Sequence, residues 1–281
     1  ERKNGMAMTC DGLAIGYPEK LVAGHIHMEI NQGAHVAVLG DNGQGKTTFL
    51  RTLAGGLATK GGKFRWGYGL KVGYYAQHVF ATLDPDSDVY THMADVAAPE
   101  VMRQEILNLA GSFLFKGDDI KKKVSVLSGG EQARLCLAGL LLTKSQVLLL
   151  DEPTNHLDFE TVEALGRALK SFSGTLFFIS HDRTFVNLVA SEIVEVNNGA
   201  VRRYPGTYED YVYHLETTLR EELGQSNGQK APTSEPSGNT KSDYHLRKEK
   251  ESEKRKLSTR LKKIDAELTV FKKEHETIHR D

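Results

Sequence analysis

The sequence contains few cysteines and no apolar run of the length that a membrane span requires. Cys10 and Cys136 alone cannot build a disulfide framework, and the first residues do not resemble a signal peptide. The apolar run 147–150 is followed at once by two carboxylates, whereas a membrane-spanning helix needs about 20 apolar residues. We therefore expect a soluble protein of the reducing cytoplasm, with no membrane insertion.

Net charge is also almost absent, because 36 Lys and Arg residues face 37 Asp and Glu residues. This balance gives no reason to expect that the whole chain binds a polyanion, so any basic partner surface must be local. The 281 residues exceed one average domain. Composition predicts a large folded domain over 1–215, a flexible linker over 216–243 and a charged coiled-coil helix over 244–281.

Two changes along the chain support this division. Residues 224–242 are rich in Gly, Ser, Asn, Gln, Thr and Pro and contain almost no large apolar side chain, which is typical of a linker. Beyond them, residues spaced alternately four and three apart form a heptad seam with one polar member, His275. The seam consists of Leu257, Leu261, Ile264, Leu268, Phe271, His275 and Ile278.

Short apolar runs alternate with helical patterns from Leu13 to about Tyr213, which predicts an α/β domain. The clearest predicted strands are 35–39, 147–150 and 175–179. Their continuous apolar character suits strands that are buried on both faces of a mostly parallel sheet, and ligands bind at the carboxyl ends of such strands. The stretches 12–17, 28–30 and 62–75 predict an antiparallel β subdomain.

A glycine-rich loop follows the first buried strand and precedes a helical pattern over 48–53. Its residues are Gly40, Asp41, Asn42, Gly43, Gln44, Gly45, Lys46 and Thr47, with Thr48 next. This pattern at a strand-to-helix junction is that of a loop whose N–H groups bind nucleotide phosphates. Lys46 is suited to neutralise the β- and γ-phosphates, and the Thr47 hydroxyl to bind Mg²⁺. A chance glycine-rich turn is the alternative, and the flanking strand and helix disfavour it.

Two adjacent acids, Asp151 and Glu152, end the second buried strand beside this loop. Adjacent strand residues point in opposite directions, so the two carboxylates cannot share one role. We expect Asp151 to hold the Mg²⁺ of Thr47 through water, and Glu152 to orient or deprotonate the attacking water. The alternative is an ordinary acidic turn before a proline, which the phosphate loop makes less attractive.

A second helix N-terminus follows a Ser-Gly-Gly turn and opens the helical pattern over 131–142. The segment 127–132, Leu-Ser-Gly-Gly-Glu-Gln, resembles the signature motif of ATP-binding cassette proteins, and 151–158 resembles their Walker B segment. The resemblance covers roughly 13–209 and implies a P-loop NTPase fold with an antiparallel β subdomain and a small helical subdomain. It implies that Ser128, Gly129, Gly130 and Glu131 act on the ATP of a partner cassette. A simple helix cap is the alternative for this turn.

The same resemblance implies roles for three further residues. Gln77 matches the glutamine that reaches Mg²⁺ and the attacking water, so that Thr47, Gln77 and Asp151 form the expected metal set. His181 matches the switch histidine that contacts the γ-phosphate, and Tyr17 matches the aromatic residue that stacks on adenine. Catalysis would then rest on Glu152, Gln77 and His181.

Residues 155–158, Asn-His-Leu-Asp, and the charged end of the chain resemble the ABC-F branch, whose members carry two cassettes and mostly act on ribosomes. One phosphate loop and one signature are present, so we expect the second half of a longer protein that ends inside a helical hairpin. The expected partners are a second cassette, in the full-length chain or as a homodimer, and the ribosome or RNA. The alternatives are the ATPase subunit of an ABC transporter and a scaffold that does not hydrolyse ATP.

The basic residues of the predicted tail are candidates for contact with nucleic-acid phosphates. They include Arg247, Lys248, Arg255, Lys256, Lys262 and Lys263. Interspersed acids, including Glu249, Glu251, Glu253 and Glu267, leave a solvated coiled-coil surface as the alternative.

Overall fold

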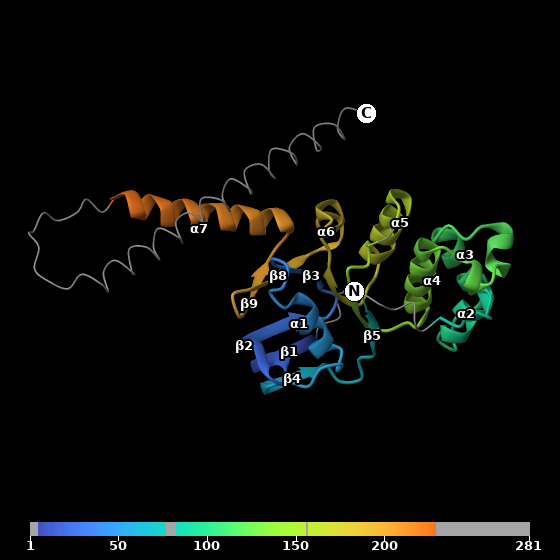
Figure 1. Ribbon diagram of the computed structural model, residues 1–281, viewed down its shortest axis with the longest axis horizontal. Coiled ribbons are helices and arrows are strands. Elements are labelled where there is room, and N and C mark those ends of the chain that lie inside the picture. The colour runs from blue at the N-terminus through green and yellow to red at the C-terminus, as the bar shows by residue number, and fades with distance from the viewer. Residues whose placement is uncertain (1–4, 77–82, 156, 229–281) are drawn as a thin grey trace, which may run out of the picture. The chain divides into compact units, whose positions relative to one another are not determined.

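The computed structural model describes residues 5–76, 83–155 and 157–228 of the chain. The chain divides into two compact units, of which the first ends at Tyr208 (Figure 1). The strands are β1 Met6–Tyr17, β2 Lys20–Asn31, β3 His35–Leu39, β4 Gly61–Trp66, β5 Val72–Tyr75, β6 Val147–Asp151, β7 Thr175–Ile179, β8 Glu192–Asn197 and β9 Ala200–Pro205. The helices are α1 Lys46–Leu53, α2 Val89–Val96, α3 Arg103–Ser112, α4 Gly129–Leu142, α5 Phe159–Lys170, α6 Arg183–Val189 and α7 Tyr208–Gly228, with 3-10 turns η2 Gly117–Lys121 and η3 Val124–Val126.

The larger sheet has six strands in the order β5-β6-β7-β3-β8-β9. The first five run parallel to one another, and β9 pairs antiparallel with β8. Every residue of β6 and β7 is buried, which explains why these strands read as continuous apolar runs. The predicted α/β fold with a mostly parallel sheet is confirmed, and β3, β6 and β7 are the three strands that the sequence marks most clearly.

The smaller sheet is antiparallel, in the order β2-β1-β4. Strand β2 alternates buried and exposed residues toward its end, as a sheet with one solvated face requires. Helix α1 contacts strands of both sheets, and its Phe49 belongs to one apolar core that includes Ile30 of β2 and Phe177 of β7. The phosphate loop therefore starts at a strand and ends at a helix that are both fixed by the core.

Helices α2, α3 and α4 pack on one another and gather on the side of the first unit away from β1, β2 and β4 (Figure 1). The C-terminal half of α4 also contacts the β5 edge of the larger sheet. This cluster is the small helical subdomain that the resemblance implied. It positions the N-terminus of α4, where the Ser-Gly-Gly turn lies.

Three expectations need correction or lie outside the described residues. The stretch 62–75 is not wholly antiparallel, because β5 pairs in parallel with β6 in the larger sheet. The linker predicted over 216–243 is wrong at its start, because α7 continues to Gly228. The remaining linker and the predicted coiled coil over 244–281, with its basic residues, lie outside the described residues.

Candidate functional site

The phosphate loop connects β3 to α1 and is anchored on the β8–β9 turn. Gln44 contributes its side-chain oxygen to this anchor and accepts a hydrogen bond from the Asn198 N–H at 2.9 Å. Gly45 has φ +105°, and a Cβ added there would lie 2.2 Å from Cγ1 of Val22. Only glycine fits this position, because both the left-handed backbone and the neighbouring side chain exclude a Cβ.

Lys46 begins α1 and is only 9% exposed. Its ammonium donates to the carbonyl oxygens of Gly40 at 2.8 Å and Asp41 at 3.2 Å, so the loop curls around its own lysine. Burial lowers the pKa of Lys46, while the carboxylates of Glu152, Asp41 and Asp151 oppose that shift. The loop thus surrounds one concentrated positive charge, which suits a polyanionic ligand.

Asp151, the last residue of β6, faces the N-terminus of α1. Its Oδ1 accepts a hydrogen bond from the Thr47 hydroxyl at 3.2 Å, whereas its Oδ2 is buried with no hydrogen-bond partner among the described residues. Burial raises the pKa of Asp151, and the Thr47 hydrogen bond and Lys46 oppose the shift. A buried carboxylate oxygen without a partner, next to a threonine hydroxyl, is an oxygen donor set that fits a hard cation such as Mg²⁺.

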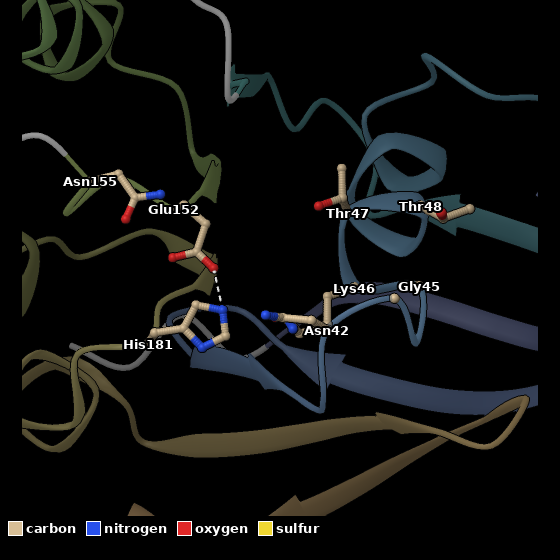
Figure 2. Close-up of a pocket in the computed structure, with 9 residues that line it drawn as sticks. Asn42, Gly45, Lys46, Thr47, Thr48, Glu152, Asn155 and His181 are labelled. Carbon is tan, nitrogen blue, oxygen red and sulfur yellow. Dashed lines mark ion pairs between the residues drawn. The ribbon is translucent and has the colours of Figure 1, made fainter.

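Glu152 follows Asp151 but contacts a different partner, His181. Its Oε1 lies 3.1 Å from Nε2 of His181, and its side chain is 11% exposed (Figure 2). Burial raises the pKa of Glu152, while nearby His181 and Lys46 oppose this. The backbone of Glu152 is left-handed, with φ +54°. The two acids therefore have separate surroundings, in line with the separate roles that the sequence suggested.

A pocket of about 440 Å³ lies between the phosphate loop and these polar strand ends (Figure 2). Its lining residues are Asn42, Gly43, Gly45, Lys46, Thr47, Thr48, Glu152, Asn155 and His181. Eight of the nine were predicted as site residues. Asn155 is new: the sequence marks it only as part of a branch-specific segment, although its place three residues after Glu152 in the same loop was a usable signal.

The structure does not bring every predicted residue into the pocket wall. Tyr17 lies at the end of β1 with 40% of its surface exposed. Gly40, Asp41 and Gln44 support the loop through backbone and anchoring contacts. Gln77 lies outside the described residues, so its expected place beside the metal stays a prediction.

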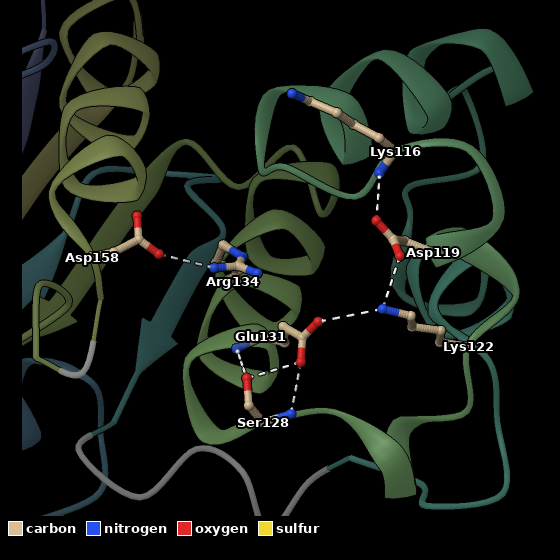
Figure 3. Close-up of polar contacts among 7 residues, drawn as sticks. All are labelled: Lys116, Asp119, Lys122, Ser128, Glu131, Arg134 and Asp158. Carbon is tan, nitrogen blue, oxygen red and sulfur yellow. Dashed lines mark hydrogen bonds and ion pairs between the residues drawn. The ribbon is translucent and has the colours of Figure 1, made fainter.

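The signature segment forms the N-terminus of α4 (Figure 3). Ser128 and Glu131 form a capping box, in which Glu131 Oε2 accepts from the backbone N–H and from the hydroxyl of Ser128, each at 2.8 Å. These hydrogen bonds from Ser128 lower the pKa of Glu131, which is therefore ionised at neutral pH. Ser128, Gly129, Gly130 and Glu131 do not line the phosphate-loop pocket.

A chain of charges continues on both sides of the capping box (Figure 3). Lys122 lies 3.8 Å from Glu131 and 2.8 Å from Asp119. Further along α4, Arg134 pairs with Asp158 at 3.2 Å. Asp158 is also the N-cap of α5, because it accepts from the Thr161 N–H at 2.8 Å. Arg134 therefore joins the signature helix to the loop that starts at Glu152.

Comparisons with known proteins agree with this geometry. A family model described as "ABC transporter" matches residues 23–155. The chain is 39% identical over 206 residues to "Probable ATP-binding protein YbiT" of Escherichia coli O157:H7, covering 73% of this chain and 39% of that protein. It is 36% identical over 205 residues to "ABC transporter F family member 5" of Arabidopsis thaliana, covering 73% of this chain and 29% of that protein. The chain thus spans about a third of the length of these curated relatives.

Among solved structures, the chain resembles the archaeal ribosome recycling factor aABCE1, solved with the ribosomal stalk protein aP1, with a TM-score of 0.65 and 27% identity. The match covers 78% of this chain and 43% of that one. The phosphate loop, the two strand-end carboxylates and the capped signature helix lie in the fold that the chain shares with this solved structure. The chain therefore contains an ATP-binding cassette domain of the ABC-F type.

Proposed function

We propose that the domain over residues 1–215 binds Mg-ATP in the pocket around Lys46 and hydrolyses it when a second cassette completes the site. The observation that carries the proposal is the divergence of the two strand-end carboxylates, one toward Thr47 and the other toward His181. One carboxylate is thereby available to a metal and the other to a reacting water. Lys46, at present bonded to two loop carbonyls, neutralises the β- and γ-phosphates.

Mg²⁺ fits the oxygen donors next to the phosphate loop. The Thr47 hydroxyl and the buried Oδ2 of Asp151 would hold the ion as hard oxygen donors, and Gln77 is the third member of the predicted set. The metal, when bound, neutralises charge on the phosphates.

Glu152 is the proposed general base. Burial raises its pKa, which makes it a stronger proton acceptor than an exposed carboxylate. His181, which is 60% exposed at the pocket, is the proposed contact to the γ-phosphate, and its 3.1 Å contact with Glu152 keeps the base next to the same space. Asn42, Gly43, Gly45 and Thr48 contribute the remaining pocket wall around the phosphates.

A conservative substitution tests this assignment. In the 281-residue chain, Glu152→Gln should lower the ATP turnover number by roughly a hundredfold or more, because it removes the proton acceptor but keeps the side-chain shape. ATP affinity should be retained, since Lys46 and the loop are untouched. Glu160→Gln, an exposed position on α5, is the matched control. Unchanged turnover in Glu152→Gln would eliminate Glu152 as the base.

Pairing with a second cassette follows from the separation of the two anion sites. The signature residues do not line the pocket, and one nucleotide needs only one helix N-terminus of this kind. We propose that Ser128, Gly129, Gly130 and Glu131 complete the site of another cassette, which the relatives' greater length allows to lie on the same full-length chain. Tyr17, at the end of β1, is the proposed platform for adenine.

Mixing two inactive variants tests the pairing. Lys46→Met disables the pocket and Ser128→Arg disables the signature. A pair formed by one chain of each kind still contains one intact site, built from Lys46 of one chain and Ser128 of the other. We expect each variant alone to be inactive and the mixture to regain turnover. A mixture that stays inactive while the parent chain turns over ATP would argue against shared sites.

The ribosome is the proposed place of action, in the cytoplasm. The support is the ABC-F relationship and the likeness to a ribosome recycling factor. No helix within the described ranges is long and apolar enough to cross a membrane. Cosedimentation with ribosomes and with membrane vesicles separates this role from that of a transporter subunit. Binding to ribosomes that weakens with salt supports it, whereas binding to vesicles alone contradicts it.

A further inference from the structure

The backbone of Glu152 is in an unfavourable conformation. Its φ of +54° is in the left-handed region, which the Cβ of an L-residue disfavours. Such residues persist only where the surrounding structure holds them, and they occur often at functional sites. The neighbours of Glu152 should therefore include groups that maintain this conformation.

Strands β6 and β7 continue to pair beyond the end of the sheet. The Glu152 N–H donates to the carbonyl oxygen of Ile179 at 3.1 Å. Two residues further along, the hydroxyls of Thr154 and Ser180 are hydrogen-bonded to each other at 3.0 Å. Next to these two links, the Glu152 carboxylate contacts Nε2 of His181 at 3.1 Å. The loop that carries the carboxylate and the loop that carries the imidazole are thus tied to each other at two points close to this contact.

The hydroxyl link is itself fixed by helix α6. Ser180 Oγ accepts a hydrogen bond from the Asp182 N–H at 3.1 Å, and Asp182 caps α6 by accepting from the Phe185 N–H at 3.0 Å. Ser180 is only 5% exposed. Its hydroxyl therefore has little access to water as a replacement for Thr154, and loss of that partner leaves a buried polar group with one bond fewer.

We propose that Thr154 and Ser180 are positioning residues that hold Glu152 in its left-handed conformation, with its carboxylate against His181. The inference rests on the proposed role of Glu152 as general base. Without the hydroxyl link, the loop after β6 keeps a single backbone tie to β7, and Glu152 relaxes to a right-handed or extended backbone. Its carboxylate then leaves the position from which it reaches the attacking water.

This role predicts a loss in the chemical step without a loss in nucleotide binding. Lys46, Thr47 and Asp151 hold the phosphates and the metal, and Thr154 and Ser180 have no hydrogen bond to any of them. A small displacement of a catalytic group is enough to lower a turnover number by one or two orders of magnitude. We therefore expect Thr154→Val to reduce kcat by roughly tenfold to a hundredfold and to leave KM for ATP within about twofold.

The test compares this link with a second hydroxyl pair in the same domain. Thr143 and Ser145, after the end of α4, share a 2.8 Å hydrogen bond, and Ser145 is 8% exposed. Thr143→Val is therefore a matched control that removes a comparable bond away from the pocket. Thr154→Ser restores the hydroxyl and should rescue kcat, whereas Ser180→Ala should reproduce the Thr154→Val defect and add nothing to it in the double variant.

Crystal structures of the nucleotide-free parent, Thr154→Val and Thr143→Val chains supply a readout that does not depend on turnover. The proposal predicts that Glu152 loses its positive φ and its contact with His181 in Thr154→Val while remaining as described in Thr143→Val. It is overturned if Glu152 keeps both features in Thr154→Val, or if kcat falls equally in the two valine variants. Failure of Glu152 as the base shows separately, as undiminished turnover in Glu152→Gln.

Discussion

Asp158 offers a quantitative test of how the signature helix is joined to the loop after β6. It caps α5 through the Thr161 N–H and pairs with Arg134 on α4. Replacing an N-cap by alanine costs about 1 kcal/mol. The ion pair adds about 0.5 kcal/mol, since Asp158 is 55% exposed and water screens the pair. Asp158→Ala should therefore lower the free energy of unfolding by about 1.5 kcal/mol.

Asp88 separates these two contributions. It caps α2 in the same way, by accepting from the Thr91 N–H at 2.8 Å. Asp88→Ala should cost about 1 kcal/mol, the value of the cap alone. Asparagine caps helices as well as aspartate does, so Asp158→Asn should cost only the ion pair, about 0.5 kcal/mol, and Asp88→Asn close to nothing.

Urea unfolding followed by the fluorescence of Trp66 measures these differences in the first unit. Trp66 is the single tryptophan, and its ring packs edge-on against Phe177 in the core at 5.9 Å. The hydrogen bond from the Thr161 N–H holds the pKa of Asp158 below its usual value. The stabilisation that ionised Asp158 provides is therefore present at neutral pH and is lost as pH falls through its folded-state pKa. Equal costs for Asp158→Ala and Asp88→Ala would refute a role for Arg134.

Three further outcomes follow from the site. Burial raises the pKa of Asp151, so its ionised form costs folding free energy at neutral pH. Asp151→Asn should therefore raise the thermal midpoint of unfolding of the nucleotide-free chain. The same variant should weaken Mg-dependent ATP binding. Gly45→Ala should abolish ATP binding because the added Cβ would meet Val22. Gly43 has φ +80° but open space where a Cβ would lie, so Gly43→Ala should still bind ATP, more weakly than the parent chain. Titration with a fluorescent nucleotide measures both. Glu131→Gln preserves the capping box but removes a charge that would face the partner's phosphates in the proposed pair, so turnover should reach half its maximum at a lower chain concentration.

Sequence patterns predict the elements whose signal is local. Strands β3, β6 and β7 are buried on both faces, and their apolar runs end at the residues where the structure ends them or one residue earlier. The phosphate loop and the signature turn are equally local, since each is a short glycine-containing segment at a helix N-terminus. Eight residues of the pocket wall could be named in advance because they belong to such segments.

Sequence patterns miss features that depend on pairing between distant segments. Strand β5 has only four residues, and its parallel partner β6 lies more than 70 residues away, so nothing local separates it from the antiparallel sheet. The β8–β9 hairpin was not predicted, although its turn contains Asn198 and Gly199, both with positive φ. The hydroxyl link between Thr154 and Ser180 likewise joins residues 26 positions apart and leaves no periodic trace.

The capping box at the signature has a consequence for how a second cassette is recognised. The Ser128 hydroxyl has one proton, and in the nucleotide-free domain it is donated to Glu131. A phosphate that is to accept from Ser128 must therefore displace an ionised carboxylate, whose charge also repels it. Lys122 offsets only part of that charge, because at 3.8 Å from Glu131 it lies closer to Asp119. On the proposed pairing of two cassettes, the signature should therefore bind a weak anion poorly and prefer a phosphate that carries its own metal countercharge, as Mg-ATP does.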